Sequence, residues 1–234
     1  MSVLHYSLAA LFLPLFPLSM VFNALFGWLR NGVLRALILL LWPQFGLLLM
    51  AAPDATMPQW LLPLAVFTSA LYAFRALALR EMGQWVAYLA TSAWALLWLA
   101  LLNDAAIGLL QLYALAFSAP LALLALLGAR LERGFGAAYT GLYGGLANRL
   151  PRLSGVLVFA VLAVVAVPLF PGFFAMLGTI VTTMPATPLV AALVAGIWLL
   201  WSWAGVRLLQ GLIVGPDNGG EAPDLSVAST SLYA

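Results

Sequence analysis

The sequence predicts an all-α integral membrane protein with about seven transmembrane helices. Of its 234 residues, 65% are hydrophobic and only 7% are charged, a composition far outside that of soluble domains. Its mean hydropathy is +1.11. Apolar windows of about 20 residues, the length that crosses a bilayer core, recur along the chain. Short polar links separate several windows, which favours antiparallel neighbouring helices. We therefore expect residues 1–214 to form a single transmembrane helical domain.

The first predicted span is Val3–Phe26. No positively charged stretch precedes it, and Pro14 and Pro17 interrupt it. These features are not those of a cleavable signal peptide, so we expect the span to remain in the mature protein. The other predicted spans, in order, are Val33–Ala52, Gln59–Leu79, Gln84–Leu102, Ala105–Ala129, Ser154–Met184 and Pro188–Val214.

The sixth span, Ser154–Met184, is predicted to be broken at Pro168–Gly172. It has no charged residue, yet as one helix it would be roughly 46 Å long against a hydrocarbon core of about 30 Å. Each proline removes a backbone donor and clashes with the preceding turn. Backbone amides and carbonyls that lose their helical partners at membrane depth must be covered by protein or by a polar cavity. Ion-transporting folds use this arrangement. The alternative reading is that the prolines only kink a packed helix.

The arginines indicate the orientation of the spans. All nine basic residues are arginines, and most lie in the connections after the first, third and fifth spans, on one side of the membrane. The opposite connections carry only Asp54 and Asp104. The positive-inside rule places the arginine side in the cytoplasm, and with seven spans the N-terminus is then outside and the C-terminus cytoplasmic. We predict a multi-pass protein of the cell inner (plasma) membrane. The cytoplasmic arginines of interest are Arg75, Arg80, Arg130, Arg133, Arg149 and Arg152.

Two segments are too polar to span. Residues 130–153 are predicted to form a cytoplasmic interfacial loop or short surface helix, and their four arginines can bind anionic lipid headgroups. Residues 215–234 are polar, acidic and rich in turn residues, so we expect a C-terminal tail that is disordered or lies on a partner.

Composition excludes several kinds of chemistry. The chain has no cysteine and one histidine, His5, which argues against disulfides, thiolate catalysis and Cys- or His-based metal sites. A formal charge of +2 is too small to suggest a nucleic-acid partner. Ser92, Ser118 and Ser202 have no histidine or acid in the same span, so a nucleophilic hydrolase has no support. We predict no catalytic residue, no metal site and no cofactor.

Titratable groups are missing from the middle of every predicted span. Membrane proton transport needs such groups, and arginine, with a pKa above about 12, is a poor proton carrier. Uncharged polar residues do lie inside the spans, although such hydroxyls often bond back to their own helix. The candidate polar path consists of Gln111, Tyr113, Thr179, Thr182 and Thr183.

Four tryptophans recur at helical spacing. We read them as lipid-facing or interfacial packing rather than as a cofactor site. They are Trp94, Trp98, Trp198 and Trp201.

From Gln59 to Val214 the order of motifs resembles the antiporter-like membrane subunits of respiratory complex I and of Mrp-type cation/proton antiporters. One part of the likeness is a helix with an Ala-Tyr-Ser/Thr pattern; another is a succession of Gly-Gly-Leu, Leu-Pro and Pro-Gly-Phe steps. The residues that carry it are Ala87-Tyr88, Thr91-Ser92, Gly144-Gly145-Leu146, Leu150-Pro151 and Pro171-Gly172-Phe173.

The chain departs from this family where the family handles protons. The resemblance implies a Lys or Glu shortly after Gly-Phe in the broken helix; here that position is Met176, whose thioether cannot titrate. The preceding family helix carries His or Lys, whereas Gln111 and Tyr113 are the polar groups here. The turn before Ala87 begins with Glu81 where the family has Lys or Arg. The chain is also about half the family's usual length. The broken-helix element comprises Pro168, Pro171, Gly172, Phe173 and Met176.

These departures lead to three hypotheses. The first is a shortened, non-catalytic accessory subunit of a proton- or cation-translocating complex, which does not pump by itself and packs against lipids and other membrane subunits, including a full-length antiporter-like relative. The complex would be redox-driven or would couple ion flux to uptake of a solute such as inorganic carbon. The second is a self-contained small transporter or channel. The third, a membrane enzyme acting on lipid, is disfavoured because no nucleophile–base pair is present.

Overall fold

The computed structural model describes residues 3–51, 57–140, 144–214, 224 and 230. Within them the chain forms ten α-helices and no β-strand, as the all-α prediction requires. The helices are α1 (Val3–Phe12), α2 (Ser19–Trp28), α3 (Gly32–Met50), α4 (Leu61–Ala76), α5 (Met82–Leu102), α6 (Ile107–Phe135), α7 (Leu146–Arg149), α8 (Pro151–Val164), α9 (Pro171–Thr183) and α10 (Pro188–Ile213).

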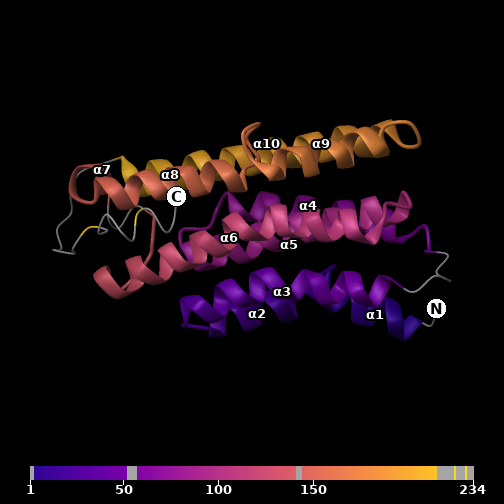
Figure 1. Ribbon diagram of the computed structural model, residues 1–234, viewed down its shortest axis with the longest axis horizontal. Helices are drawn as coiled ribbons and strands as arrows, with labels where there is room; N and C mark the ends of the chain where they lie inside the picture. The colour runs from indigo at the N-terminus through magenta and orange to yellow at the C-terminus, as the bar shows by residue number, and fades with distance from the viewer. Residues whose placement is uncertain (1–2, 52–56, 141–143, 215–223, 225–229, 231–234) are drawn as a thin grey trace.

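The long helices run along one common axis of the molecule (Figure 1). In this view α1–α3 lie along one side, α4–α6 in the middle, and α8–α10 along the other side (Figure 1). By length and composition α3, α5, α6 and α10 can each cross a membrane, while α4, α8 and α9 are shorter apolar helices. The apolar window of α5 is 89% buried and that of α10 only 33%, so α5 is the core of the bundle and α10 presents its apolar surface outwards.

The first predicted span, Val3–Phe26, is two helices rather than one. α1 ends at Phe12 and α2 begins at Ser19, with Pro14 and Pro17 between them. Proline cannot continue a helix without losing a backbone hydrogen bond, which accounts for the interruption. α1 and α2 follow one another along the bundle axis (Figure 1).

The predicted sixth span also contains two helices. α8 ends with a reverse turn in which Ala166 has φ 58°, the Ala166 N–H donates to the Ala163 carbonyl at 3.1 Å, and the Val167 N–H donates to the Leu162 carbonyl at 3.2 Å. This pattern is a Schellman motif. Pro171 then opens α9 at a position where the missing N–H costs nothing. α8 and α9 follow one another along α10 (Figure 1).

Part of the predicted interfacial segment, residues 130–153, is helical. α6 continues beyond Ala129 to Phe135 and ends at Gly136, whose φ of 78° suits glycine. α7 and the start of α8 occupy the other end of this segment. The predicted tail, 215–234, lies outside the described residues except for Asp224 and Thr230.

Asp224 contacts the beginning of α8. Its carboxylate accepts hydrogen bonds from the backbone amides of Arg152 and Leu153, both at 3.2 Å. These amides belong to the first turn of α8, where they have no partner within the helix. This tail residue therefore caps α8, whose own N-cap, Leu150, provides no side-chain acceptor.

Candidate functional site

Met176 lies in the second turn of α9 and is completely buried, with 0% exposure. Gly172, one turn earlier, is buried where α9 begins, and an added Cβ there would lie 3.5 Å from both the Ala163 carbonyl and the Ala166 Cβ. Phe173 packs against Trp198 of α10, with ring centroids 5.5 Å apart. By contrast, Pro168 and Pro171 are exposed. The predicted broken-helix residues thus lie at the junction of α8, α9 and α10, with Met176 directed into the packed interior.

No acidic, basic or imidazole side chain accompanies Met176 on α9 or on the neighbouring α5. The sequences of α5 and α9 contain no Asp, Glu, Lys, Arg or His. The charged residues of α6 begin at Arg130, near its end, and the charge on α10 is Arg207, two turns before its end. The burial of Met176 is therefore that of an apolar core residue.

The threonines of the predicted polar path bond within α9 or to the end of α5. The Thr179 hydroxyl donates to the Ala175 carbonyl at 2.9 Å, and the Thr182 hydroxyl donates to the Gly178 carbonyl at 2.8 Å. The Thr183 hydroxyl accepts from Asn103 Nδ2 at 3.1 Å. Thr179 and Thr183 are buried, while Thr182 is exposed.

The other two path residues lie on α6. The Tyr113 hydroxyl is next to Gly178 of α9, where there is no room for a Cβ. The backbone carbonyl of Gln111 accepts from Gln44 Nε2 at 3.1 Å. The structure therefore brings Tyr113 to the threonine segment, at the end of the bundle where α5 and α9 finish and α6 begins.

A larger set of buried polar contacts joins α2, α4, α5 and α10. Ser69 and Ser92 each donate a hydroxyl to the other's backbone carbonyl at 2.8 Å, and the Trp201 indole N–H donates to Ser92 Oγ, also at 2.8 Å. The Ser19 and Tyr72 hydroxyls are 2.9 Å apart. We call the residues that share these contacts the interior polar cluster; they are Ser19, Asn23, Ser69, Tyr72, Thr91, Ser92 and Trp201.

Asn23 is the member of this cluster with spare hydrogen-bonding capacity. Its Nδ2 donates to the Ser19 carbonyl at 2.7 Å and to Thr91 Oγ1 at 3.1 Å. Its Oδ1 is buried and has no hydrogen-bond donor among the described residues. Asn23 cannot be singled out from the sequence, because a lone amide in an apolar stretch gives no sign of which helix it faces.

The tryptophans are internal hydrogen-bond donors, which corrects the prediction that they face lipid or the interface. Trp94, Trp98 and Trp201 are at most 1% exposed. The Trp98 indole N–H donates to the Leu13 carbonyl at 2.9 Å, and that of Trp198 donates to the Val165 carbonyl at 2.9 Å. Both carbonyls lie where a helix has just ended, so the indoles satisfy backbone groups that the interruptions release.

A partly buried ion pair lies at the arginine end of the bundle. Arg35 of α3 donates to Glu132 of α6 at 3.0 Å, and Arg35 is only 5% exposed. Glu81, the N-cap residue of α5, is the second carboxylate close to Arg35. These residues and Arg133 line a pocket of about 1010 Å³. The sequence could not reveal this pair, because its members are 97 residues apart.

Burial is the largest influence on Glu81, and it raises the pKa of this carboxyl above 4.5. The Glu132 charge also raises the pKa, while the positive charge of Arg35 and the backbone amide of Gln84 lower it. Because Glu81 precedes α5, it lies outside the membrane-spanning helices.

The predicted arginines occupy this same end of the bundle, but their partners differ. Arg75 lies over the Tyr88 ring, with its guanidinium carbon 5.0 Å from the ring centroid. Arg130 donates to the Asp224 carbonyl at 3.5 Å, and Arg133 donates to the Ala129 carbonyl at 3.2 Å. The other three lie in the α4–α5 connection, in α7 and in α8; they are Arg80, Arg149 and Arg152.

Comparison with known proteins relates residues 28–200 to a family described as "NADH:quinone oxidoreductase/Mrp antiporter, TM". None of the curated proteins matches the sequence.

Solved structures match the whole fold. A chain of respiratory complex I from Thermus thermophilus with bound NADH superimposes with a TM-score of 0.86 at 25% identity, over 96% of this chain and 50% of that one. A chain of the membrane-bound sulfane sulfur reductase, an archaeal respiratory membrane complex, gives 0.84 at 20% identity, over 96% and 49%. A chain of the Mrp complex from Dietzia sp. DQ12-45-1b gives 0.78 at 17%, over 90% and 41%. The protein thus spans about half the length of the chains it matches.

Proposed function

The chain belongs to the NADH:quinone oxidoreductase/Mrp antiporter transmembrane family, and from this premise we propose that it is an accessory, antiporter-like subunit that does not carry protons itself. It would serve an ion-translocating complex as a scaffold, a seal or the wall of a half-channel. Complete burial of Met176, with no Asp, Glu, Lys, Arg or His on α5 or α9, carries this proposal. A proton carrier at membrane depth must change charge, which a thioether cannot do.

We propose seven crossings for this subunit. α3, α4, α5, α6 and α10 would each cross once, and the pairs α1–α2 and α8–α9 would each form one interrupted crossing. The end-to-end placement of α8 and α9 supports this reading, because their 14 and 13 residues are each too short to cross a core of about 30 Å alone. The alternation of the helices then collects the arginines at one end, and the positive-inside rule assigns that end to the cytoplasm.

The proposed partners are lipids and other membrane subunits, including a full-length antiporter-like relative. The related chains of known structure come from multi-subunit membrane complexes, which supports such an assembly. Large apolar side chains on the outside of the bundle are available for both lipid and protein contact, among them Leu189 and Leu199 of α10, at 73% and 72% exposure.

Purification in mild detergent from the native membrane, followed by proton-flux measurement in liposomes, tests the proposal. We expect the chain to co-purify with larger membrane subunits and to give no proton flux when reconstituted alone. A monodisperse lone chain that moves protons would overturn the proposal.

A self-contained transporter is the second candidate, and the interior polar cluster favours it. The buried Asn23 Oδ1, which has no donor within the described part of the chain, is a group that a polar solute could engage. Under this reading Asn23→Leu should abolish solute flux by the lone chain while leaving its elution profile in detergent unchanged.

A further inference from the structure

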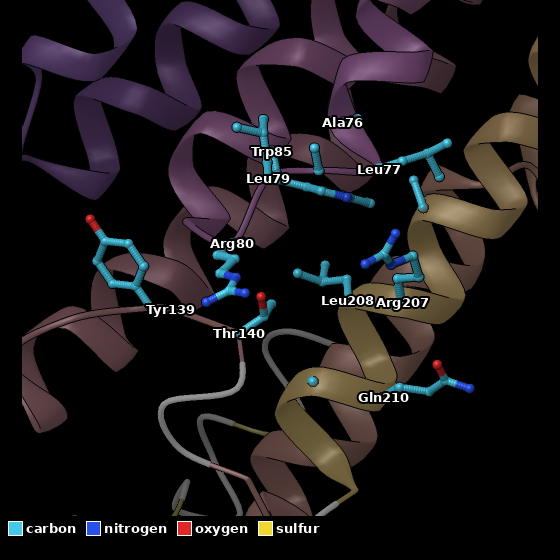
Figure 2. Close-up of a pocket in the computed structure, with 13 residues that line it drawn as sticks. Ala76, Leu77, Leu79, Arg80, Trp85, Tyr139, Thr140, Arg207, Leu208 and Gln210 are labelled. Carbon is cyan, nitrogen blue, oxygen red and sulfur yellow. The ribbon is translucent and has the colours of Figure 1, made fainter.

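A second pocket opens at the arginine end of the bundle, between the α4–α5 connection, the segment after α6, and α10. Its volume is about 970 Å³. Figure 2 shows Arg80 and Arg207 on opposite sides of it, with Thr140 beside Arg80 and Leu208 between the two arginines. Apolar residues from the end of α4 and from α10 also line it, namely Ala76, Leu77, Ala204 and Leu208.

The backbone around Arg80 is held by a short antiparallel bridge. The Thr140 N–H donates to the Arg80 carbonyl at 2.7 Å, and the Met82 N–H donates to the Ala138 carbonyl at 3.0 Å. These bonds flank the bridge between Glu81 and Tyr139. Arg207 is fixed independently, because it lies within α10. Both guanidinium groups are therefore carried on ordered backbone.

Neither the Arg80 nor the Arg207 guanidinium has an anionic or hydrogen-bonding partner among the described residues. Arg35, by contrast, is paired with Glu132. The positive charges of Arg80 and Arg207 repel each other. An anion bound between them would attract both, and this attraction would outweigh the repulsion. Guanidinium groups bind phosphate oxygens with paired N–H donors, which makes phosphate a well-matched anion.

The surroundings of the pocket select a lipid as the source of that phosphate. Trp203 lies one turn before Arg207 on α10 and is 61% exposed, as expected for an aromatic residue at the membrane interface. Ala76, the last residue of α4, and Ala204, one turn before Arg207 on α10, put apolar lining on the side of the arginines nearer the middle of these helices. Basic pockets between membrane helices with this combination bind anionic headgroups.

We propose that the pocket binds the phosphate of one anionic phospholipid, with Arg80 and Arg207 as its ligands and the acyl chains along α4 and α10. The Thr140 and Gln210 side chains would offer further donors at the pocket entrance. This site goes beyond general attraction of lipid to basic loops, because it assigns one headgroup to two defined side chains.

Native mass spectrometry of the purified full-length chain, or of the complex that contains it, tests this site. The probes are phosphatidylglycerol, zwitterionic phosphatidylcholine and inorganic phosphate. The test variant is Arg207→Gln, which removes a charge from an exposed position of α10 and should not disturb folding; Arg80→Gln is the second variant. Arg30→Gln is the matched control, since Arg30 is exposed at the same end of the bundle but lines the other pocket.

We expect phosphatidylglycerol retention to fall about fivefold for each pocket arginine removed, with little change for Arg30→Gln. Phosphatidylcholine and inorganic phosphate should bind at least tenfold more weakly. Three results would each overturn the proposal: retention unchanged in both pocket variants, an equal loss in Arg30→Gln, or equal occupancy by inorganic phosphate, which would indicate a soluble anion rather than a lipid.

Discussion

The Trp198 indole N–H donates to the Val165 carbonyl at 2.9 Å, at the point where α8 ends. The Leu13 carbonyl, at the end of α1, accepts in the same way from Trp98, and that of Leu11 accepts from Trp42 at 3.0 Å. The backbone at the break between α1 and α2, and at the break between α8 and α9, thus receives hydrogen bonds from indoles of neighbouring helices. An unsatisfied backbone carbonyl surrounded by hydrocarbon costs several kcal/mol, so these donors help an interrupted helix to persist in a membrane.

Trp198→Phe should therefore destabilise the protein by about 1–3 kcal/mol, because it keeps an aromatic ring but leaves the Val165 carbonyl without its donor. Thermal unfolding in detergent measures the change. Trp203→Phe is the control, since Trp203 lies on the exposed face of the same helix and should show almost no effect. Equal losses in the two variants would mean that ring packing, and not the hydrogen bond, accounts for the role of Trp198.

Ala166, in the turn after α8, has a backbone conformation that favours glycine. Ala166 has φ 58°, and the left-handed region costs a residue with a Cβ roughly 1–2 kcal/mol. Ala166→Gly should raise the unfolding free energy by about 0.5–1 kcal/mol, after allowing for the greater flexibility of glycine when unfolded. Ala192→Gly, on an exposed position within α10, should lower it by a similar amount. A loss of stability in both variants would contradict the strained geometry.

The sequence was a good guide to properties that depend on nearby residues. Composition predicts the all-helical class, which the described residues confirm. A single crossing broken at Pro168–Gly172 stays a prediction, although α8 and α9 separate at that point. The tryptophans differ from their prediction because both lipid and the packed interior are apolar, so hydrophobicity does not tell which face of a membrane helix is inside. The Arg35–Glu132 pair and the interior polar cluster depend on contacts between distant helices, which one sequence does not encode visibly.

The Arg35–Glu132 pair should matter more for stability than a surface ion pair does. Glu132→Gln would leave the Arg35 guanidinium buried without the negative charge that offsets its own. We expect this variant to lose about 2–3 kcal/mol of unfolding free energy. Arg35→Gln, combined with Glu132→Gln, should recover part of that loss, and a double-mutant cycle measures the coupling. Additive effects of the two substitutions would show that the pair contributes no interaction of its own.

The raised pKa of Glu81 predicts a specific dependence of stability on pH. The folded protein holds the Glu81 proton more tightly than the unfolded chain does, so the associated stability is present below about 4.5 and is lost as pH rises through the higher folded value. Glu81→Gln keeps a neutral side chain at every pH. Its unfolding free energy relative to the wild type should therefore increase as pH rises from 4 to 7. A constant difference between the two proteins over this range would contradict the burial of the Glu81 carboxyl.

Substitutions of Met176 test whether the buried side of α9 is dry or can hold a charge. Met176→Leu should change stability by less than about 1.5 kcal/mol, because the two side chains have similar volume. Met176→Lys places an ammonium at a position with 0% exposure, next to α5 and without an acid on α5 or α9.

We expect the lysine variant to be strongly destabilised or to carry a neutral amine, and to give no proton flux in liposomes, since an isolated buried charge shifts its protonation rather than remain ionised. Unfolding in detergent and a pH-sensitive dye inside liposomes measure these two properties. If Met176→Lys instead keeps wild-type stability and conducts protons, a hydrated path must already reach α9. The bundle would then need only one titratable side chain to move protons, and the assignment of an accessory role to this protein would depend on Met176 alone.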